Sequence, residues 1–228
     1  ITVDPSNPDN IFLATFNGVY KSADRGLSWE QVYQGLNPSQ SATIYLTVDP
    51  SNPDTVFAGT LSGIAVSRDG GDTWERPAGR VSDKVISALA VHPFDSQVVL
   101  AGTEGKGAFR SLDGGNTWEN CFTKASPDAN SIQSLVFAPS EPGIIYAGTE
   151  GGIFRSDDGG SSWDTVAGMG ISTPEVRDVI VSPVDPETVF IATRRGVFGT
   201  DNGGRLWRRL TFGTIYQGAN FLSFDPLN

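Results

Sequence analysis

Basic residues are scarce in this sequence and are nowhere clustered. The 228 residues include 16 Lys and Arg against 26 Asp and Glu, which gives a net charge of −10. Sequence-independent binding to nucleic acid needs clustered Lys and Arg that displace phosphate counterions, and attraction to anionic membrane surfaces needs the same. We therefore expect no nucleic-acid partner. An acidic balance of this kind favours a soluble protein that is extracellular, at the cell surface or periplasmic.

Long apolar runs are absent from the sequence, and cysteine and histidine occur only once each. No run of about 18 apolar residues occurs, so we expect no insertion into a membrane. The single cysteine, Cys121, excludes an internal disulfide framework. The single histidine, His92, precedes a turn proline, and one histidine in that place cannot build a Ser/His/Asp triad. The chain starts at Ile1 without an initiator methionine or signal peptide, and we interpret it as a processed or partial chain.

Turn-forming residues are abundant by contrast. The sequence holds 27 glycines and 14 prolines, while only 18% of its residues are charged. This composition is typical of an all-β fold with many turns, and it is unlike that of helical or disordered chains.

One eight-residue pattern occurs five times. Its best example is Ser111-Leu112-Asp113-Gly114-Gly115-Asn116-Thr117-Trp118, and we call each copy a Ser–Trp element; the copies span 22–29, 67–74, 111–118, 156–163 and 200–207. All five tryptophans belong to these elements and follow one another at 45, 44, 45 and 44 residues. So regular a period over nearly the whole chain predicts a repeat architecture.

Each period carries four short strand signals. An inner strand, such as 86–91 or 132–137, ends at a proline that cannot continue a ladder. A turn leads to a second strand (56–60, 98–103, 144–149, 189–193), and a glycine turn leads to a third. The Ser–Trp element then reverses the chain into a fourth strand that begins at the tryptophan. Four antiparallel strands without helices predict one β-propeller blade per period.

We expect one β-propeller domain or segment over residues 1–228, with blades at about 1–36, 43–80, 85–124, 131–170 and 176–212. Residues 220–228 resemble the start of a further blade, whereas the first inner strand lacks its beginning. Two inner strands cannot share the first blade. We therefore expect part of a larger propeller of six to eight blades, which other chains could complete; a five-bladed ring closed by exchanged ends is the alternative.

The Ser–Trp element resembles the Asp-box, or bacterial neuraminidase repeat, S-x-D-x-G-x-[ST]-W. Four copies match every fixed position, and the fifth departs at Thr200, Asn202 and Leu206. We expect the carboxylates and hydroxyls to bond to turn amides, the glycines to supply unusual backbone angles and the tryptophans to fill gaps between sheets. The residues with these structural roles are Ser22, Asp24, Gly26, Trp29, Ser67, Asp69, Gly71, Trp74, Ser111, Asp113, Gly115, Trp118, Ser156, Asp158, Gly160, Trp163, Thr200, Asn202, Gly204 and Trp207.

These carboxylates could also be interpreted as metal ligands, because Asp157-Asp158 looks calcium-like. They lack the longer alternation of oxygen ligands that a calcium loop uses, so we expect no metal and no cofactor. Asp-box families keep the repeat on the propeller face away from the active centre, and the resemblance implies the same here.

Binding residues are expected at the opposite ends of the blades, where turns and inter-blade connections differ between repeats. Arg194 and Arg195 stand out, because guanidinium groups can bind a carboxylate through two parallel bonds. Glu104 and Glu150 occupy equivalent turns and are weak candidates for a glycosidase carboxylate pair. The remaining candidates for ligand binding in these loops are Lys106, Arg80, Arg177 and Tyr216.

The resemblance covers several functions, and fold alone does not choose among them. Sialidases carry an Arg-Ile-Pro signature that is absent here, and the two catalytic aspartates of xyloglucan hydrolases cannot be placed on this sequence. Sortilin-type receptors and the photosystem II assembly factor use similar repeats to bind partners. We therefore expect a non-catalytic binding or assembly propeller that recognises a protein or glycan; the alternative is a secreted glycoside hydrolase whose catalytic residues lie partly outside this chain.

Overall fold

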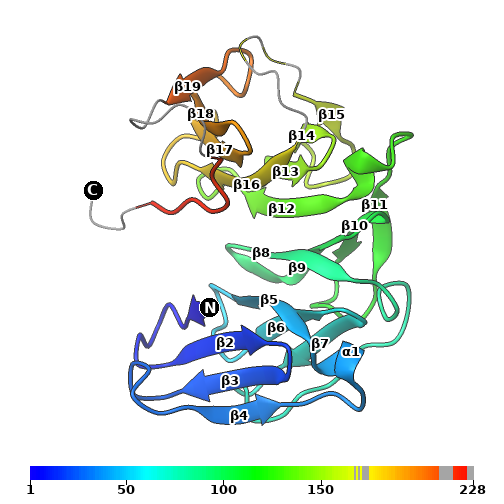
Figure 1. Ribbon diagram of the computed structural model, residues 1–228, viewed down its shortest axis with the longest axis vertical. Helices are drawn as coiled ribbons and strands as arrows, with labels where there is room; N and C mark the ends of the chain where they lie inside the picture. The colour runs from blue at the N-terminus through cyan, green and yellow to red at the C-terminus, as the bar shows by residue number, and fades with distance from the viewer. Residues whose placement is uncertain (167, 169, 171–174, 211–217, 225–228) are drawn as a thin grey trace. The chain divides into compact units, whose positions relative to one another are not determined.

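The computed structural model describes residues 1–166, 168, 170, 175–210 and 218–224. Its strands form five antiparallel sheets, each built from strands that follow one another in the chain (Figure 1). We call the sheets blades 1 to 5. This arrangement confirms the prediction of an all-β fold made of propeller blades.

Four blades have four strands each. Blade 1 contains β1 (Thr2–Val3), β2 (Ile11–Thr15), β3 (Gly18–Ser22) and β4 (Glu30–Tyr33). Blade 3 contains β8 (Ile86–His92), β9 (Asp95–Thr103), β10 (Gly107–Ser111) and β11 (Glu119–Phe122). Blade 4 contains β12 (Ile132–Phe137), β13 (Ile145–Thr149), β14 (Gly152–Ser156) and β15 (Asp164–Thr165). Blade 5 contains β16 (Val176–Val181), β17 (Val189–Thr193), β18 (Gly196–Thr200) and β19 (Arg208–Leu210).

Blade 2 departs from the predicted four strands. It contains β5 (Thr43–Val48), β6 (Val56–Thr60) and β7 (Gly63–Ser67), and only the single bridge between Val66 and Glu75 stands where a fourth strand would pair. The next residues explain the difference. The Arg76 guanidinium donates to the Ser62 carbonyl and to the Tyr33 hydroxyl, and Pro77 has no N–H for a ladder.

Two further expectations were wrong in detail. The fourth strand begins one residue after the tryptophan, at Glu30, Glu119, Asp164 and Arg208, because the indole is part of the turn. In the described part of the chain, two short helices also interrupt the connections, α1 (Pro38–Ser41) and the 3₁₀ turn η1 (Asp128–Asn130). Helix α1 follows from local chemistry, since Asn37 caps it by accepting the Gln40 N–H and Pro38 occupies its first turn.

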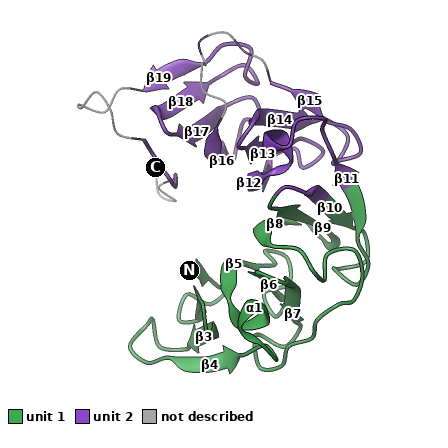
Figure 2. Ribbon diagram, turned by 45° about the vertical axis from the view of Figure 1, so that its right-hand side comes forward, with its two compact units in different colours: residues 1–104, 109–120 green, residues 105–108, 121–228 purple. Residues whose placement is uncertain are grey.

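The chain forms two compact units (Figure 2). Unit 1 is Ile1–Glu104 with Phe109–Asn120, and unit 2 is Gly105–Ala108 with Cys121–Asn228. The core of each unit lies between successive blades rather than inside one sheet. In unit 1, Phe12 and Val19 of blade 1 pack with Val56 of blade 2. In unit 2, Tyr146 of blade 4 packs with Val179 of blade 5. Each blade thus has two apolar faces and needs neighbours to cover them.

Candidate functional site

The Ser–Trp element forms a closed hydrogen-bonded turn. In the second copy, Asp69 Oδ1 accepts the Thr73 N–H at 2.8 Å and the Ser67 hydroxyl at 2.8 Å, while Oδ2 accepts the Thr73 hydroxyl at 2.5 Å. The hydroxyl of Thr73 is the chief reason why the pKa of Asp69 falls from 3.8 to about 2. The indole N–H of Trp74 donates to the Gly71 carbonyl at 3.0 Å.

Asp24, Asp113 and Asp158 repeat these bonds, and each has a pKa of about 2 because of the hydroxyl at the Ser/Thr position of its own element. Both oxygens of each carboxylate are therefore engaged within the turn. Among the described residues, no group of three or more His, Cys, Asp or Glu side chains is placed to hold a metal ion. The geometry gives these aspartates a stabilising role in the turn.

The fifth element makes fewer bonds. Asn202 Oδ1 accepts the Thr200 hydroxyl at 2.8 Å and the Leu206 N–H at 3.0 Å, but Leu206 has no hydroxyl for a further bond. Among the described residues, the buried indole N–H of Trp207 has no hydrogen-bond partner.

The Ser–Trp elements lie beside the proline turns of their own blades. Backbone bonds join the Gly70 N–H to Asp54 O in blade 2 and the Gly203 N–H to Glu187 O in blade 5. The turns between second and third strands and the connections between blades therefore lie at the other end of each sheet, which we call the loop end.

An arginine cluster occupies the loop end of blade 5. Arg177 Nε lies 2.9 Å from Glu175 Oε1, and Arg194 Nε pairs with the other oxygen of the same carboxylate. Arg177 also donates to the amide oxygen of Asn220. The Arg194 side chain is 70% exposed, whereas that of Glu175 is 21% exposed. The structure thus brings two of the predicted ligand-binding arginines together around a glutamate that sequence reasoning did not single out.

The other predicted residues that the structure describes are all exposed. Arg195 is exposed on the turn beside Arg194. Glu150 is exposed and accepts a bond from the Gln133 amide at 3.3 Å. Glu104 and Arg80 are exposed in unit 1, and Lys106 is exposed in unit 2. Tyr216 lies outside the described residues.

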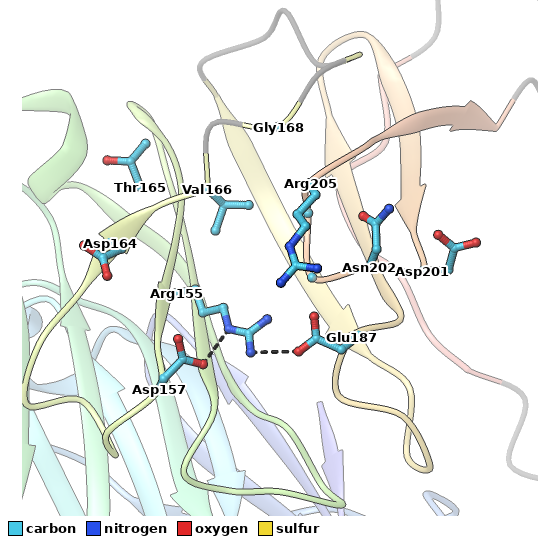
Figure 3. Close-up of a pocket in the computed structure, with 12 residues that line it drawn as sticks. Arg155, Asp157, Asp164, Thr165, Val166, Gly168, Glu187, Asp201, Asn202 and Arg205 are labelled. Atoms are coloured by element: carbon cyan, nitrogen blue, oxygen red, sulfur yellow. Dashed lines mark hydrogen bonds and ion pairs between the residues drawn. The ribbon is translucent and has the colours of Figure 1, made fainter.

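A hollow of about 640 Å³ lies between blades 4 and 5, at the end of the sheets that carries the Ser–Trp elements (Figure 3). Arg155 crosses it, with Nε 2.7 Å from Asp157 and a terminal nitrogen 2.8 Å from Glu187 (dashed lines in Figure 3). The same guanidinium donates to the Tyr146 hydroxyl at 3.0 Å. Burial raises the pKa of Tyr146 to about 12, so it stays a neutral phenol.

Arg155 joins the two blades electrostatically. Its ion pairs hold the side chain, which is only 18% exposed, and the Tyr146 hydroxyl in turn donates to Pro186 O at 3.1 Å in the proline turn of blade 5. The sequence contained a signal for this residue, because the position before the Ser of the element is also basic at Lys21 and Arg110. We interpret the hollow as an inter-blade seam in which Arg155, Asp157 and Glu187 are already paired with one another.

A smaller hollow of about 270 Å³ lies at the loop end of blade 1. Phe16 and Leu36 line it and are 75% and 95% exposed. The described residues that line it carry no charge, and they include the amide side chains of Asn17, Gln34 and Asn37.

Three comparisons place the chain among known proteins. A family model described as Sortilin-Vps10 (sortilin, neurotensin receptor 3) matches residues 62–150. No curated protein sequence matches the chain significantly. Many solved structures share its fold. One is an ancestral GH74 enzyme, with a TM-score of 0.84 and 23% identity over 95% of this chain and 31% of that enzyme.

Two other similar structures differ from each other in function. The GH74 xyloglucanase from Xanthomonas campestris has a TM-score of 0.64 and 18% identity over 92% of this chain and 44% of that one. YCF48 bound to D1 peptide has a TM-score of 0.57 and 19% identity over 83% of this chain and 59% of that one.

These comparisons support the β-propeller fold and leave the function open between enzymes and binding proteins. The chain spans less than half the length of the GH74 enzymes that it matches. At these identities the likeness concerns the fold, and function has to be argued from the residues of this chain.

Proposed function

We propose that this chain is a non-catalytic binding or assembly propeller, and that it recognises a protein or glycan through the loop ends of its blades. The observation that carries the proposal is the arginine cluster of blade 5, where Arg177 and Arg194 share the single carboxylate of Glu175. Two cations on one anion leave a positive surplus, and Arg195 is a further exposed arginine on the same turn as Arg194. In a chain with a net charge of −10, such a surplus favours an anionic group of a partner.

Glu175 fixes the Nε edge of Arg194 and leaves the rest of this largely exposed guanidinium facing solvent. An orientation fixed before binding reduces the entropy lost when a ligand is bound. A guanidinium in this state can take a carboxylate with two parallel bonds. An acidic peptide segment or an acidic sugar residue satisfies that geometry. The similarity to YCF48 bound to D1 peptide supports peptide recognition on such a fold.

Binding of a fluorescein-labelled hexaglutamate peptide and of an oligogalacturonate tests the proposal. We expect saturable binding of at least one probe, weakened about tenfold or more by the double substitution Arg194→Ala and Arg195→Ala, which corresponds to about 1.4 kcal/mol. Arg25→Ala is the matched control, because Arg25 is an exposed arginine beside Asp9 in blade 1. Equal affinities for wild type and the double variant, or no binding of either probe, would refute the role of the cluster.

The alternative is a glycoside hydrolase with part of its catalytic machinery outside this chain. The likeness to GH74 enzymes over nearly the whole chain favours it, and Glu104 and Glu150 are the candidate acids. Sugar release from a panel of polysaccharides, lost on Glu104→Gln or Glu150→Gln, would replace the binding proposal with this one.

Three finer assignments belong to the same proposal. The hydrogen bonding within the Ser–Trp elements supports their assignment as Asp-boxes. The five blades are proposed to form one segment of a larger propeller. The acidic surface supports an extracellular, cell-surface or periplasmic location. Within the described part of the chain, every helix is too short to cross a membrane.

A further inference from the structure

Glu175 leaves its two arginine partners in different states. Arg177 Nε lies 2.9 Å from the Glu175 carboxylate, and a terminal nitrogen of Arg177 donates to the amide oxygen of Asn220. Two of the three nitrogens of this guanidinium therefore have partners, and the side chain is 29% exposed. Arg194 pairs with Glu175 through Nε, and its side chain is 70% exposed. Arg194 is thus the member of the cluster that can contact a ligand, with the Glu175 carboxylate on the opposite edge of its guanidinium.

The exposure of Arg194 comes from its place at the start of the turn between β17 and β18. The equivalent residues of blades 3 and 4 are Glu104 and Glu150, and both are exposed as well. Those two blades have a blade before and after them in the chain, so exposure belongs to this turn position in general. What differs is the charge, because the same position holds Phe16 and Leu61 in blades 1 and 2. Only blade 5 places a cation there.

The Glu175 carboxylate is a fixed charge of the cluster. Its side chain is 21% exposed and is paired with both arginines, one at each oxygen. The other carboxylate on this part of the chain, Asp178, accepts the Ser134 hydroxyl at 3.0 Å. Arg177, Arg194 and Glu175 together therefore carry a single positive charge.

We propose that Glu175 sets the charge selectivity of the arginine cluster. It matches the cluster to the singly charged carboxylates of an acidic peptide and disfavours doubly charged phosphate groups. The inference rests on the proposed function, because it concerns the ligand of the same site.

The physical reason is the number of charges on each group. A carboxylate bound to Arg194 neutralises the single positive charge that the two arginines and Glu175 carry together. A phosphorylated side chain carries about 1.5 to 2 negative charges at pH 7, so it leaves a negative surplus. Glu175 repels each negative charge of a bound group, and its repulsion is therefore nearly twice as large for phosphate as for carboxylate.

Fluorescence anisotropy with labelled hexaglutamate and hexaphosphoserine peptides, at constant ionic strength, tests the proposal. Glu175→Gln removes the charge, so the ratio of phosphoserine affinity to glutamate affinity should rise about fivefold at about pH 7. Any loss of orientation of the arginines weakens both probes alike and cancels from this ratio. Glu175→Asp keeps the charge on a shorter side chain and should keep the ratio of the wild type.

Two controls separate this effect from other causes. Glu141→Gln removes the same charge from an exposed site in the proline turn of blade 4 and should leave the ratio unchanged. The second control is pH, since phosphate loses most of its second charge below its second pKa of about 6. At about pH 5 the glutamate probe is still largely ionised, and the rise caused by Glu175→Gln should disappear.

The outcomes distinguish this inference from the proposed function. An unchanged or lower ratio in Glu175→Gln, with hexaglutamate still bound, would overturn the inference alone. So would an equal rise in Glu141→Gln, or a rise that persists at about pH 5. A wild-type chain that binds oligogalacturonate but not hexaglutamate would also overturn the inference alone, and binding of neither would overturn both. Matching circular dichroism spectra show that the variants are folded, and Glu175→Ala is a second uncharged variant that should give the same ratio as Glu175→Gln.

Discussion

At the scale of the residue, the aspartates of the Ser–Trp elements are stabilised as anions by their own turns. Three donors converge on Asp113, namely the Thr117 hydroxyl at 2.6 Å, the Thr117 N–H at 2.8 Å and the Ser111 hydroxyl at 2.8 Å. These bonds lower the pKa of Asp113 from 3.8 to about 2. A carboxyl whose pKa is lower in the folded chain stabilises the fold above its unfolded pKa, and loses that effect as the pH falls through the folded pKa.

Asp113→Asn tests this pH dependence. Asparagine keeps an acceptor for the backbone, as Asn202 does in the fifth element, where it accepts the Leu206 N–H at 3.0 Å. We therefore expect a folded variant that is less stable than wild type at pH 5–7. The fold lowers the pKa of Asp113 from 3.8 to about 2. The stability difference between the variant and wild type should therefore shrink as the pH falls from 3.8 to about 2, and it should be nearly absent at the lower pH. Urea unfolding midpoints at a series of pH values measure it.

The control is Asp83→Asn, because Asp83 makes no hydrogen bond or ion pair with other described residues. Its difference from wild type should stay small throughout the pH series. A stability difference for Asp113→Asn that is constant with pH would mean that the carboxylate has no special stabilisation in the folded state.

At the scale of the element, glycines in the Ser–Trp turns decide how closely blades approach. Gly114 and Gly115 both have positive φ, at 67° and 89°. A Cβ on Gly114 would have its nearest contact at 3.6 Å, whereas one on Gly115 would lie 2.8 Å from the Phe57 ring of the preceding blade. The two positions thus separate backbone strain from a steric clash between blades.

Alanine at these neighbouring positions measures the contact. Gly114→Ala should lower the free energy of unfolding by about 1 kcal/mol, through the strained backbone alone. Gly115→Ala should cost about 1–3 kcal/mol more, because the methyl group forces Phe57 to move in a packed core. Denaturant unfolding of both variants gives the comparison. Equal losses of unfolding free energy in the two variants would mean that the contact between blades 2 and 3 accommodates the added methyl group without a loss of stability.

Much of this element-level structure could be predicted from the sequence. The period of the tryptophans and the prolines after the inner strands predicted the blades. These residues determine the conformation of turns that lie within a few positions of them in the sequence. The lost fourth strand of blade 2 could not be predicted in this way, since it depends on Arg76 reaching Ser62 and Tyr33, which lie far along the chain. The same reason hid Glu175, because its second partner, Arg194, lies much later in the chain, on the turn after β17.

At the scale of the whole molecule, repeated blades make stability a sum of local contacts between neighbours. Arg155 connects blade 4 to blade 5 through Glu187, while Lys21 occupies the equivalent position in blade 1 and connects it to blade 2 through Asp72. The contact between blades 4 and 5 lies within unit 2, and the contact between blades 1 and 2 lies within unit 1. A substitution at one seam should therefore loosen its own pair of blades and leave the other pair as it was.

Hydrogen exchange followed by mass spectrometry distinguishes local from global loosening. Arg155→Ala removes bonds to Asp157, Glu187 and Tyr146, and we expect a local loss of about 2 kcal/mol. Amides of β13 and β17 should exchange faster, while those of β2 and β6 keep their rates. Lys21→Ala should produce the mirror image, with a smaller effect because its partner Asp72 is 73% exposed. If both variants accelerated exchange equally in every blade, the chain would open as one cooperative body, and the nearest-neighbour description of its stability would be wrong.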